Sequence, residues 1–327
     1  MSYQEILDNL GGYEKSGVFG DLGGGLEKMH TALDKLGNPQ DKYPIIHVVG
    51  SKGKGSTVRL IEQGLIEAGL KVGSYYSPHI YRVNERIRFN GEEISDHDLD
   101  RLVHEVPTDS LTYFEFLTVC AFKFFADKGA DYAVIEAGLG GRLDATNTAK
   151  EPAVVVLTHI EKEHTDILGD TIEEIEREKL GVLRGGAKLF RDGSNEELAS
   201  QVLEYLGYTM PKSPLPLPGR FEVRDGCVFD MAHTQSSAML LRKRLEREFP
   251  GSKFFFVMSF LKGKNPRVII EELVHEHDEL ILVTMDDPRA MSSEDLSEFG
   301  TVGVIPTSWP DGYVPVMCGS ARLLKEV

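Results

Sequence analysis

The chain has 327 residues, more than the roughly 100 to 200 residues of a usual single domain, so two domains are expected. Hydrophobic residues make up 41% and charged residues 27%, a composition that supports a buried core and argues against global disorder. The 52 acidic residues outnumber the 36 lysines and arginines. The resulting formal net charge of -16 argues against nucleic acid and anionic membranes as partners.

The cysteines and the N-terminal stretch bear on the cellular compartment. Cys120, Cys227 and Cys318 are odd in number and far apart, with no C-x-x-C pair, so we expect reduced, packed thiols rather than disulfides or a zinc site. The stretch MSYQEILDNLGGYEKSG lacks the apolar core of a signal peptide. No apolar run approaches the roughly 20 residues that span a bilayer. We therefore expect a cytoplasmic protein.

Short apolar runs alternate with longer amphipathic stretches along the chain. The runs at 43–49, 131–137 and 152–160 are apolar on both faces, which is typical of strands in a parallel sheet covered by helices. Apolar residues recur at helical spacing in three further stretches, at 57–70, 114–129 and 171–185. The sequence therefore predicts an α/β fold with a mostly parallel sheet covered by helices.

A proline-rich break separates two parts of the chain. The stretch YTMPKSPLPLPGRF, at 208–221, contains four prolines, which stop a helix and remove hydrogen-bond donors from a strand. Beyond it the strand and helix patterns resume, which predicts a second, smaller α/β domain of the Rossmann-like kind. We place the first domain at 1–210, a linker at 211–219 and the second domain at 220–327.

The stretch HVVGSKGKGST, at 47–57, joins a predicted strand to a predicted helix. Its glycines would let backbone N–H groups turn toward an anion, and the new helix adds its positive N-terminal end. Lys54 would then reach the outer phosphates of a nucleotide, and the Ser56 hydroxyl would support a phosphate or its Mg²⁺. Val48 and Gly55 break the ordinary G-x-x-x-x-G-K-S/T pattern, but the tighter form G-S/T-N/K-G-K-x-S/T is met. A loose surface turn is the alternative, although the flanking strand and helix favour phosphate binding.

Several longer motifs accompany this loop in a fixed order. They are LGNPQ at 36–40, YYSPHIYRVNERIRFNGEEIS at 75–95, VIEAGLGGRLDATN at 134–147, EHTDILGDTIEEIEREKLG at 163–181, PGRFEV at 218–223 and DMAHTQ at 230–235. With them, nearly the whole sequence resembles folylpolyglutamate synthases and dihydrofolate synthases, which belong to the Mur ligase superfamily of ATP-dependent acid–amino-acid ligases. Motifs of about ten residues in the right order are far more specific than one glycine loop.

The resemblance implies a set of site residues. The ATP phosphates would be held by Gly50, Ser51, Gly53, Lys54, Gly55 and Ser56. Mg²⁺ would be bound by Ser77, Glu136 and His164, of which the oxygen ligands suit so hard a cation. Lys179, in REKLG, corresponds to a lysine that is often carbamylated in this superfamily. The nucleotide would be contacted from the second domain by Arg220, Asp230 and His233.

Read without the resemblance, several of these residues have plainer interpretations. Glu136 follows an apolar run and would be a solvent-facing strand end, and His164 would be a surface histidine in an acidic loop. Lys179 would be an exposed helix lysine paired with a glutamate such as Glu176. A basic cluster would receive the substrate's carboxylates or, equally, be a solvated loop; it consists of Arg82, Arg86 and Arg88.

The implied reaction is ATP-driven amide formation. ATP phosphorylates a pteroate or folate carboxylate, the amine of L-glutamate attacks the acyl phosphate, and phosphate leaves. Positioning and charge stabilisation by Mg²⁺ and Lys54 would supply most of the catalysis. A Mur-type ligase with a different acid acceptor is the alternative within the class, and an impaired nucleotide-binding homologue is the alternative outside it. A monomer is expected, as related enzymes are often monomeric.

Three features depart from the family's usual pattern. DMAHTQ stands where the family has D-G-A-H-N-P, and no G-x-H-Q-x-x-N-A motif occurs between 181 and 218. Lys52 stands where the family usually has asparagine. The first two differences put the adenosine-binding part of the nucleotide site in question.

Overall fold

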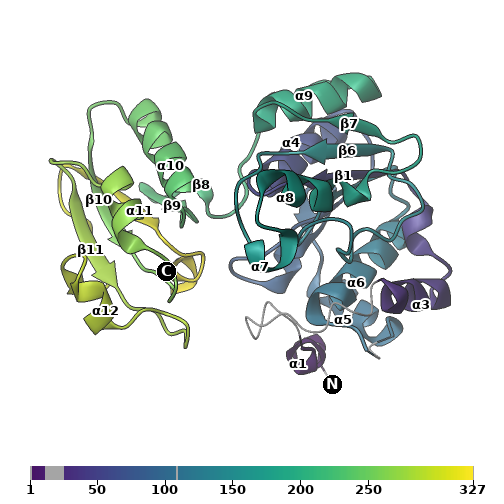
Figure 1. Cartoon of the computed structure of the whole chain (residues 1–327), viewed down its shortest axis with the longest axis horizontal. Coiled ribbons are helices and arrows are strands. Elements are labelled where there is room, and N and C mark those ends of the chain that lie inside the picture. Colours follow the sequence, from purple (N-terminus) through teal and green to yellow (C-terminus); the bar gives the residue numbers. More distant parts are fainter. Residues whose placement is uncertain (1, 12–25, 108–109, 327) are drawn as a thin grey trace. The chain divides into compact units, whose positions relative to one another are not determined.

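The computed structural model describes residues 2–11, 26–107 and 110–326. The chain forms two compact units, Met1–Leu215 and Pro216–Val327, each with its own sheet and helices (Figure 1). The division after Leu215 falls inside the proline-rich stretch 211–219, in which no residue belongs to a helix or strand.

The first unit is built on a seven-stranded sheet with the strand order β4-β3-β2-β5-β1-β6-β7. Five strands run parallel to one another: β1 (Ile45–Val49), β2 (Val72–Tyr75), β5 (Tyr132–Glu136), β6 (Val154–Leu157) and β7 (Lys188–Phe190). Two antiparallel strands complete one edge, β3 (Ile87–Phe89) and β4 (Glu92–Glu93). All five residues of the central strand β1 are buried, as both faces of the sheet are covered. The predicted mostly parallel α/β sheet is therefore confirmed.

Helices cover the two faces of this sheet. The α-helices are α1 (Tyr3–Asn9), α3 (Glu27–Lys35), α4 (Lys54–Glu67), α5 (Asp96–Glu105), α6 (Tyr113–Lys128), α7 (Thr165–Leu168), α8 (Ile172–Lys179) and α9 (Asn195–Leu206). Short 3-10 turns are η2 (Pro39–Asp41), η3 (Val83–Arg86) and η4 (Leu180–Val182). α4 packs beside α9, and α6 packs beside α3 and α5 (Figure 1).

The core of the first unit is rich in aromatic side chains from α6. Phe116, Phe122 and Phe125 are fully buried, because this helix is apolar on most of its surface. The helix begins after Thr112, whose side chain forms a capping box with Glu115.

The second unit carries a six-stranded sheet in the order β12-β11-β10-β13-β9-β8. Its strands are β8 (Arg220–Arg224), β9 (Cys227–Asp230), β10 (Lys253–Met258), β11 (Glu279–Val283), β12 (Val302–Gly303) and β13 (Tyr313–Cys318). All neighbours are parallel except β8 and β9, which form an antiparallel pair. The helices are α10 (Gln235–Glu248), α11 (Pro266–Leu273), α12 (Ser293–Ser297) and the 3-10 turn η5 (Leu323–Glu326). The predicted smaller α/β unit is thus present.

The three cysteines are free and buried, as the sequence predicts. Burial raises the pKa of Cys227 to about 12 and raises the pKa of Cys120 further, so both remain protonated at neutral pH. Within the described ranges, no helix has both the length and the apolar character needed to cross a membrane.

Candidate active site

The predicted glycine loop connects β1 to α4, at the carboxyl end of the central strand. Gly50 and Gly53 have φ values of +147° and +87°, which side chains disfavour. A Cβ at Gly50 would lie 1.9 Å from the Thr158 hydroxyl oxygen, and one at Gly53 would lie 2.2 Å from Asn195 Oδ1. Both positions therefore require glycine, and the backbone curls around the start of α4 as phosphate binding demands.

Two lysines converge on this loop. Lys54 Nζ and Lys179 Nζ each donate to the Gly50 carbonyl oxygen at 3.0 Å, although the two lysines are far apart in the sequence. Lys179 also forms an ion pair with Glu163, with 2.9 Å between Nζ and Oε1. The first turn of α4 thus has two positive charges beside it, which suits an anion with several negative charges.

Lys179 is buried, with 2% of its side chain exposed, and Glu176 pairs with Arg191 instead. The interpretation of Lys179 as an exposed helix lysine paired with Glu176 is therefore wrong. Burial lowers the pKa of Lys179, against the opposing effect of Glu163. Burial favours the neutral form of Glu163, but Lys179, Lys54 and Ser51 together outweigh it and lower the pKa of the Glu163 carboxyl.

The serines of the loop differ in their surroundings. The Ser51 amide donates to the His159 carbonyl at 2.8 Å, and its hydroxyl donates to the Glu161 carbonyl at 3.2 Å. Gly55 is buried in the first turn of α4 and Ser56 is half-buried there. The loop is therefore fastened to the segment after β6, while Ser56 lies in the helix turn next to the loop.

Ser77 and Glu136 meet where two neighbouring strands end. Glu136 is the last residue of β5, only 4% exposed, and its Oε2 accepts a hydrogen bond from the Ser77 amide at 3.0 Å. A solvent-facing strand end therefore does not describe Glu136. A carboxylate and a serine hydroxyl are oxygen donors of the kind that Mg²⁺ takes, so these two residue types, brought together by the backbone contact of Ser77, fit the implied metal.

His164 occupies the position before α7, with φ of +46°, and is half-buried. Among the described residues, no three side chains of the His, Cys, Asp and Glu types form a cluster suited to a metal. The predicted set contains only two such side chains, Glu136 and His164, with Ser77 as the third member. His164 as a ligand stays a prediction.

A buried network that the sequence did not predict fixes the loop after Glu136. Asp144 accepts hydrogen bonds from the amides of Leu139 at 2.7 Å and Thr146 at 3.0 Å, and the Thr146 hydroxyl lies 2.8 Å from His47 Nε2. Burial raises the pKa of Asp144 and lowers the pKa of His47 to about 3, so His47 is neutral at physiological pH. Asp144 belongs to the motif GLGGRLDATN, and this motif is the sequence feature from which the network could have been predicted.

The same loop packs directly against the buried lysine. A Cβ at Gly141 would lie 2.2 Å from the Lys179 carbonyl oxygen, and the Arg142 amide donates to the Glu178 carbonyl at 2.9 Å. The G-L-G-G-R segment therefore joins the Glu136 strand end to the helix that carries Lys179.

No single partner engages all three arginines proposed for the substrate, although Arg82 and Arg88 both pair with Glu93. Arg82 pairs with Asp96 at 2.7 Å. Arg88 pairs with Glu93 at 3.2 Å. Arg86 is 1% exposed, donates to His79 Nδ1 at 2.8 Å and lies over the Tyr113 ring. Each guanidinium is thus engaged by groups of the chain itself.

In the second unit, DMAHTQ forms the turn from β9 to α10. Asp230 accepts hydrogen bonds from the amides of Phe221 and Ala232, both at 2.8 Å, and burial raises its pKa despite Arg220. His233 Nδ1 lies 2.8 Å from the Met231 carbonyl oxygen. Thr234 caps α10 through the amide of Ser237. Thr234 therefore caps this helix where the usual family motif has asparagine, and Gln235 is its first residue where that motif has proline.

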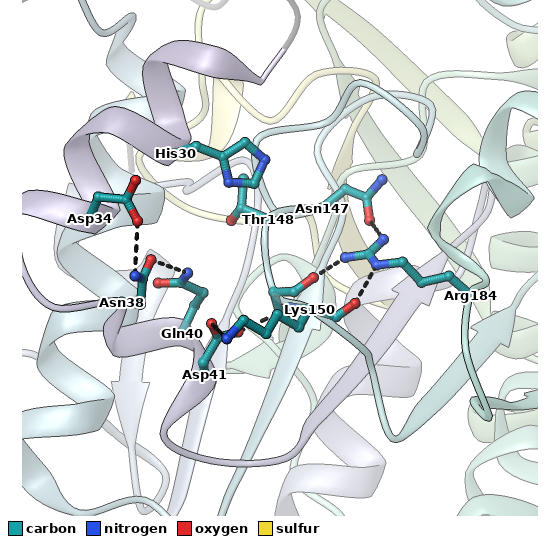
Figure 2. A pocket seen from close by; sticks show the side chains of 10 residues that line it. His30, Asp34, Asn38, Gln40, Asp41, Asn147, Thr148, Lys150 and Arg184 are labelled. Atoms are coloured by element: carbon teal, nitrogen blue, oxygen red, sulfur yellow. Dashed lines mark hydrogen bonds and ion pairs between the residues drawn. The ribbon is translucent and has the colours of Figure 1, made fainter.

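A cavity of about 410 Å³ lies elsewhere in the first unit (Figure 2). Its lining residues come from three places in the chain. α3 and the segment 38–41 precede β1, the segment 147–150 precedes β6, and Arg184 precedes β7. Figure 2 shows the Arg184 guanidinium bound to Asn147 and to backbone carbonyls, including that of Lys150 at 2.7 Å. The cavity is therefore at the amino ends of the parallel strands, whereas the glycine loop is at their carboxyl ends.

Comparison with known families and proteins shows what the chain is similar to. Residues 48–188 match the Mur ligase middle domain, and residues 222–297 match the C-terminal domain of dihydrofolate synthetase. The dihydrofolate synthase/folylpolyglutamate synthase of Bacillus subtilis (strain 168) is 40% identical over 215 residues, covering 62% of this chain and 49% of that protein. The chain thus spans about half the length of the curated relatives it matches.

Similar solved structures extend over nearly the whole chain. E. coli FolC in complex with DHPP and ADP has a TM-score of 0.83 at 25% identity, covering 100% of this chain and 96% of that one. A bifunctional folylpolyglutamate synthase/dihydrofolate synthase with Mn, AMPPNP and L-glutamate bound has a TM-score of 0.79 at 28% identity, covering 92% and 93%.

The fold is that of a Mur-type ligase, with a Mur ligase middle domain followed by a dihydrofolate synthetase C-terminal domain. The relatives and solved structures that the chain resembles are named folylpolyglutamate synthase, dihydrofolate synthase or both. The resemblance expected from the sequence is therefore confirmed.

Proposed function

We propose that the protein is an ATP-dependent ligase that joins a pteroate or folate carboxylate to L-glutamate through an acyl phosphate. It would act as a folylpolyglutamate synthase, a dihydrofolate synthase or both. The observation that carries this proposal is the convergence of Lys54 and Lys179 on the glycine loop. The Ser77–Glu136 pair lies at the ends of β2 and β5, which are parallel neighbours in the sheet.

The chemistry asks the protein to hold anions together. The loop amides and Lys54 would hold the ATP phosphates, and Lys179 adds a second positive charge beside the loop. Ser77 and Glu136, with His164 as the third proposed ligand, would hold Mg²⁺, which supplies charge neutralisation when bound. No covalent intermediate on the protein is required, so positioning is the main contribution of these side chains.

The second unit would contribute nucleotide contacts of its own. Arg220 begins β8, and Asp230 and His233 form the turn that precedes α10. We propose these three residues as nucleotide contacts on the strength of their motifs. The hydrogen bonds of Asp230 to two backbone amides favour a role in shaping the turn.

A Mur-type ligase with a different acid acceptor is the second candidate. The observation in its favour is that Arg82, Arg86 and Arg88 are each engaged by groups of the chain. These arginines would have to exchange partners before they could bind a substrate carboxylate.

Mass spectrometry of reaction products separates these candidates. The full-length protein is incubated with ATP, Mg²⁺ and L-glutamate, together with dihydropteroate or tetrahydrofolate. A glutamylated product from either acid supports the proposal and shows whether first or later glutamates are added. Glutamylation of neither acid, with ATP binding intact, would overturn it.

Two further properties stay proposals. We propose a cytoplasmic location and a monomeric state, which fit the acidic composition and the family. Cell fractionation and sedimentation velocity would test them, and a sedimenting dimer or a membrane-bound fraction would contradict them.

A further inference from the structure

Glu62 is a buried carboxylate in the helix that begins at the glycine loop. It lies eight residues after Lys54 in α4, and its side chain is 0% exposed. Removing a carboxylate from water is costly unless hydrogen bonds and an opposite charge compensate it. A buried glutamate in this position therefore needs dedicated partners.

Three side chains provide that compensation. The Ser74 hydroxyl donates to Glu62 Oε1 at 2.6 Å, and the Tyr76 hydroxyl donates to Oε2 at 2.6 Å. Arg59, one turn earlier in α4, donates from Nη1 to Oε2 at 2.8 Å. Ser74 and Tyr76 are two residues apart and so point to the same side of β2 and its continuation. The carboxylate therefore fastens the end of β2 to the glycine-loop helix.

The fastened residue directly precedes Ser77. The Tyr76 amide donates to the Arg86 carbonyl at 2.9 Å, and the Ser77 amide donates to Glu136 Oε2 at 3.0 Å. Tyr76 is thus held through its side chain by α4 and through its backbone by the neighbouring segment. The residue before Ser77 is therefore attached at two points.

We propose that Glu62 is a positioning residue for the Ser77–Glu136 pair, acting through the Tyr76 and Ser74 hydroxyls. It sets the end of β2 relative to the glycine loop, so that residues proposed for Mg²⁺ and for the phosphates belong to one rigid unit. This inference rests on the proposed function, because it takes Ser77 and Glu136 as the residues that hold Mg²⁺.

Two variants and one matched control test it. Tyr76→Phe removes the hydroxyl that donates to Glu62. Glu62→Gln removes the negative charge that accepts hydrogen bonds from Ser74, Tyr76 and Arg59. Tyr75→Phe is the control, because Tyr75 is also buried but faces α6, where its hydroxyl accepts from Thr118 at 3.3 Å. Tyr76→Phe and Tyr75→Phe each remove one hydroxyl group, and the two tyrosines are adjacent in the sequence and both buried.

The readout is the enhancement of AMPPNP binding by Mg²⁺. AMPPNP is titrated calorimetrically into the full-length protein, once with excess Mg²⁺ and once with EDTA, and the ratio of the two Kd values is taken. Residues that orient metal ligands typically change metal affinity about 10-fold to 100-fold when mutated. We expect Tyr76→Phe and Glu62→Gln to reduce the enhancement about 10-fold or more, and Tyr75→Phe to leave it unchanged.

Thermal unfolding of the same variants separates positioning from stability. A role in stability alone would lower Tm in both tyrosine variants and leave the Mg²⁺ enhancement at its wild-type value, and that result overturns the inference. An absence of any Mg²⁺ enhancement in the wild-type protein overturns it as well. If the wild-type protein shows the enhancement but glutamylates no acid, the proposed function fails while this inference is still decided by the variants.

Discussion

Several charged side chains near the glycine loop are buried or half-buried. Lys179, Glu163 and Lys54 form one group, and Glu62 and Arg59 form a second group further along α4. Isolated buried charges are costly, so each has an opposite charge or a backbone carbonyl as its partner. The motifs located Lys54 and Lys179 in the sequence, but the burial of Lys179 and its ion pair with Glu163 required the structure.

His47 provides a residue-scale prediction about pH. Its pKa is lowered by burial from 6.5 to about 3, so between these values the unfolded chain binds a proton that the folded protein does not. Acid therefore favours unfolding in this window, and stability is lost as the pH falls from 6.5 toward 3. His47→Gln removes this titrating group. As the pH is lowered, the free energy of unfolding of the variant should therefore fall less steeply than that of the wild-type protein, by up to about 1.4 kcal/mol per pH unit.

Urea unfolding at a series of pH values checks this expectation. His30→Gln is the control, because His30 is exposed in α3. Equal slopes for the wild-type protein and His47→Gln across the window would contradict the assignment.

At the scale of elements, the sequence predicted three strands of the first sheet and three of the helices that cover it, but not how the helices end. The predicted helix at 57–70 begins earlier, at Lys54, because Gly53 supplies the positive φ that the turn before it needs. The predicted helix at 171–185 ends at Lys179 and continues as a 3-10 turn to Val182. Apolar spacing locates the middle of a helix, whereas its ends depend on capping side chains and backbone angles.

The capping box of α6 gives a prediction at this scale. The Glu115 carboxylate accepts from the Thr112 amide at 2.7 Å, and the Thr112 hydroxyl accepts from the Glu115 amide at 3.4 Å. Thr112→Ala should lower the free energy of unfolding by about 1 kcal/mol, because it leaves a helix-end amide without its cap. Urea denaturation measures the difference.

Thr31→Ala is the matched control, because Thr31 lies inside α3 and its hydroxyl donates to the Glu27 carbonyl four residues earlier. Alanine is favoured inside a helix, so this variant should lose little or gain stability. An equal loss in both variants would show that the capping box adds nothing.

At the scale of the whole molecule, the proline-rich stretch indicates a break between two domains, with the first expected to end at 210, but it does not indicate how the chain is held there. Gln63, in α4, accepts from the Leu215 amide at 2.8 Å and donates to the Leu215 carbonyl at 2.9 Å. Leu215 is the last residue of the first unit. A glutamine in an amphipathic helix carries no sequence signal for such a contact, because its partner is 152 residues away.

Gln63→Leu should therefore loosen the segment before the second unit. Without the two hydrogen bonds, the backbone around Leu215 separates more readily from α4, and trypsin should cleave after Lys212 several-fold faster. Limited proteolysis with mass spectrometry of the fragments measures this rate. Gln201→Leu, at an exposed position of α9, is the control, and equal cleavage rates in the two variants would refute the proposed attachment.

Phosphate release from ATP tests the central claim most directly. The full-length protein should release phosphate only when a pteroate or folate acid and L-glutamate are both present. Lys54→Ala should reduce kcat/KM for this release about 100-fold or more, because it removes a charge-stabilising donor beside the phosphates. Lys42→Ala, which changes an exposed lysine before β1, should leave the rate unchanged. Undiminished glutamate-dependent phosphate release by Lys54→Ala would contradict the proposed ligase mechanism.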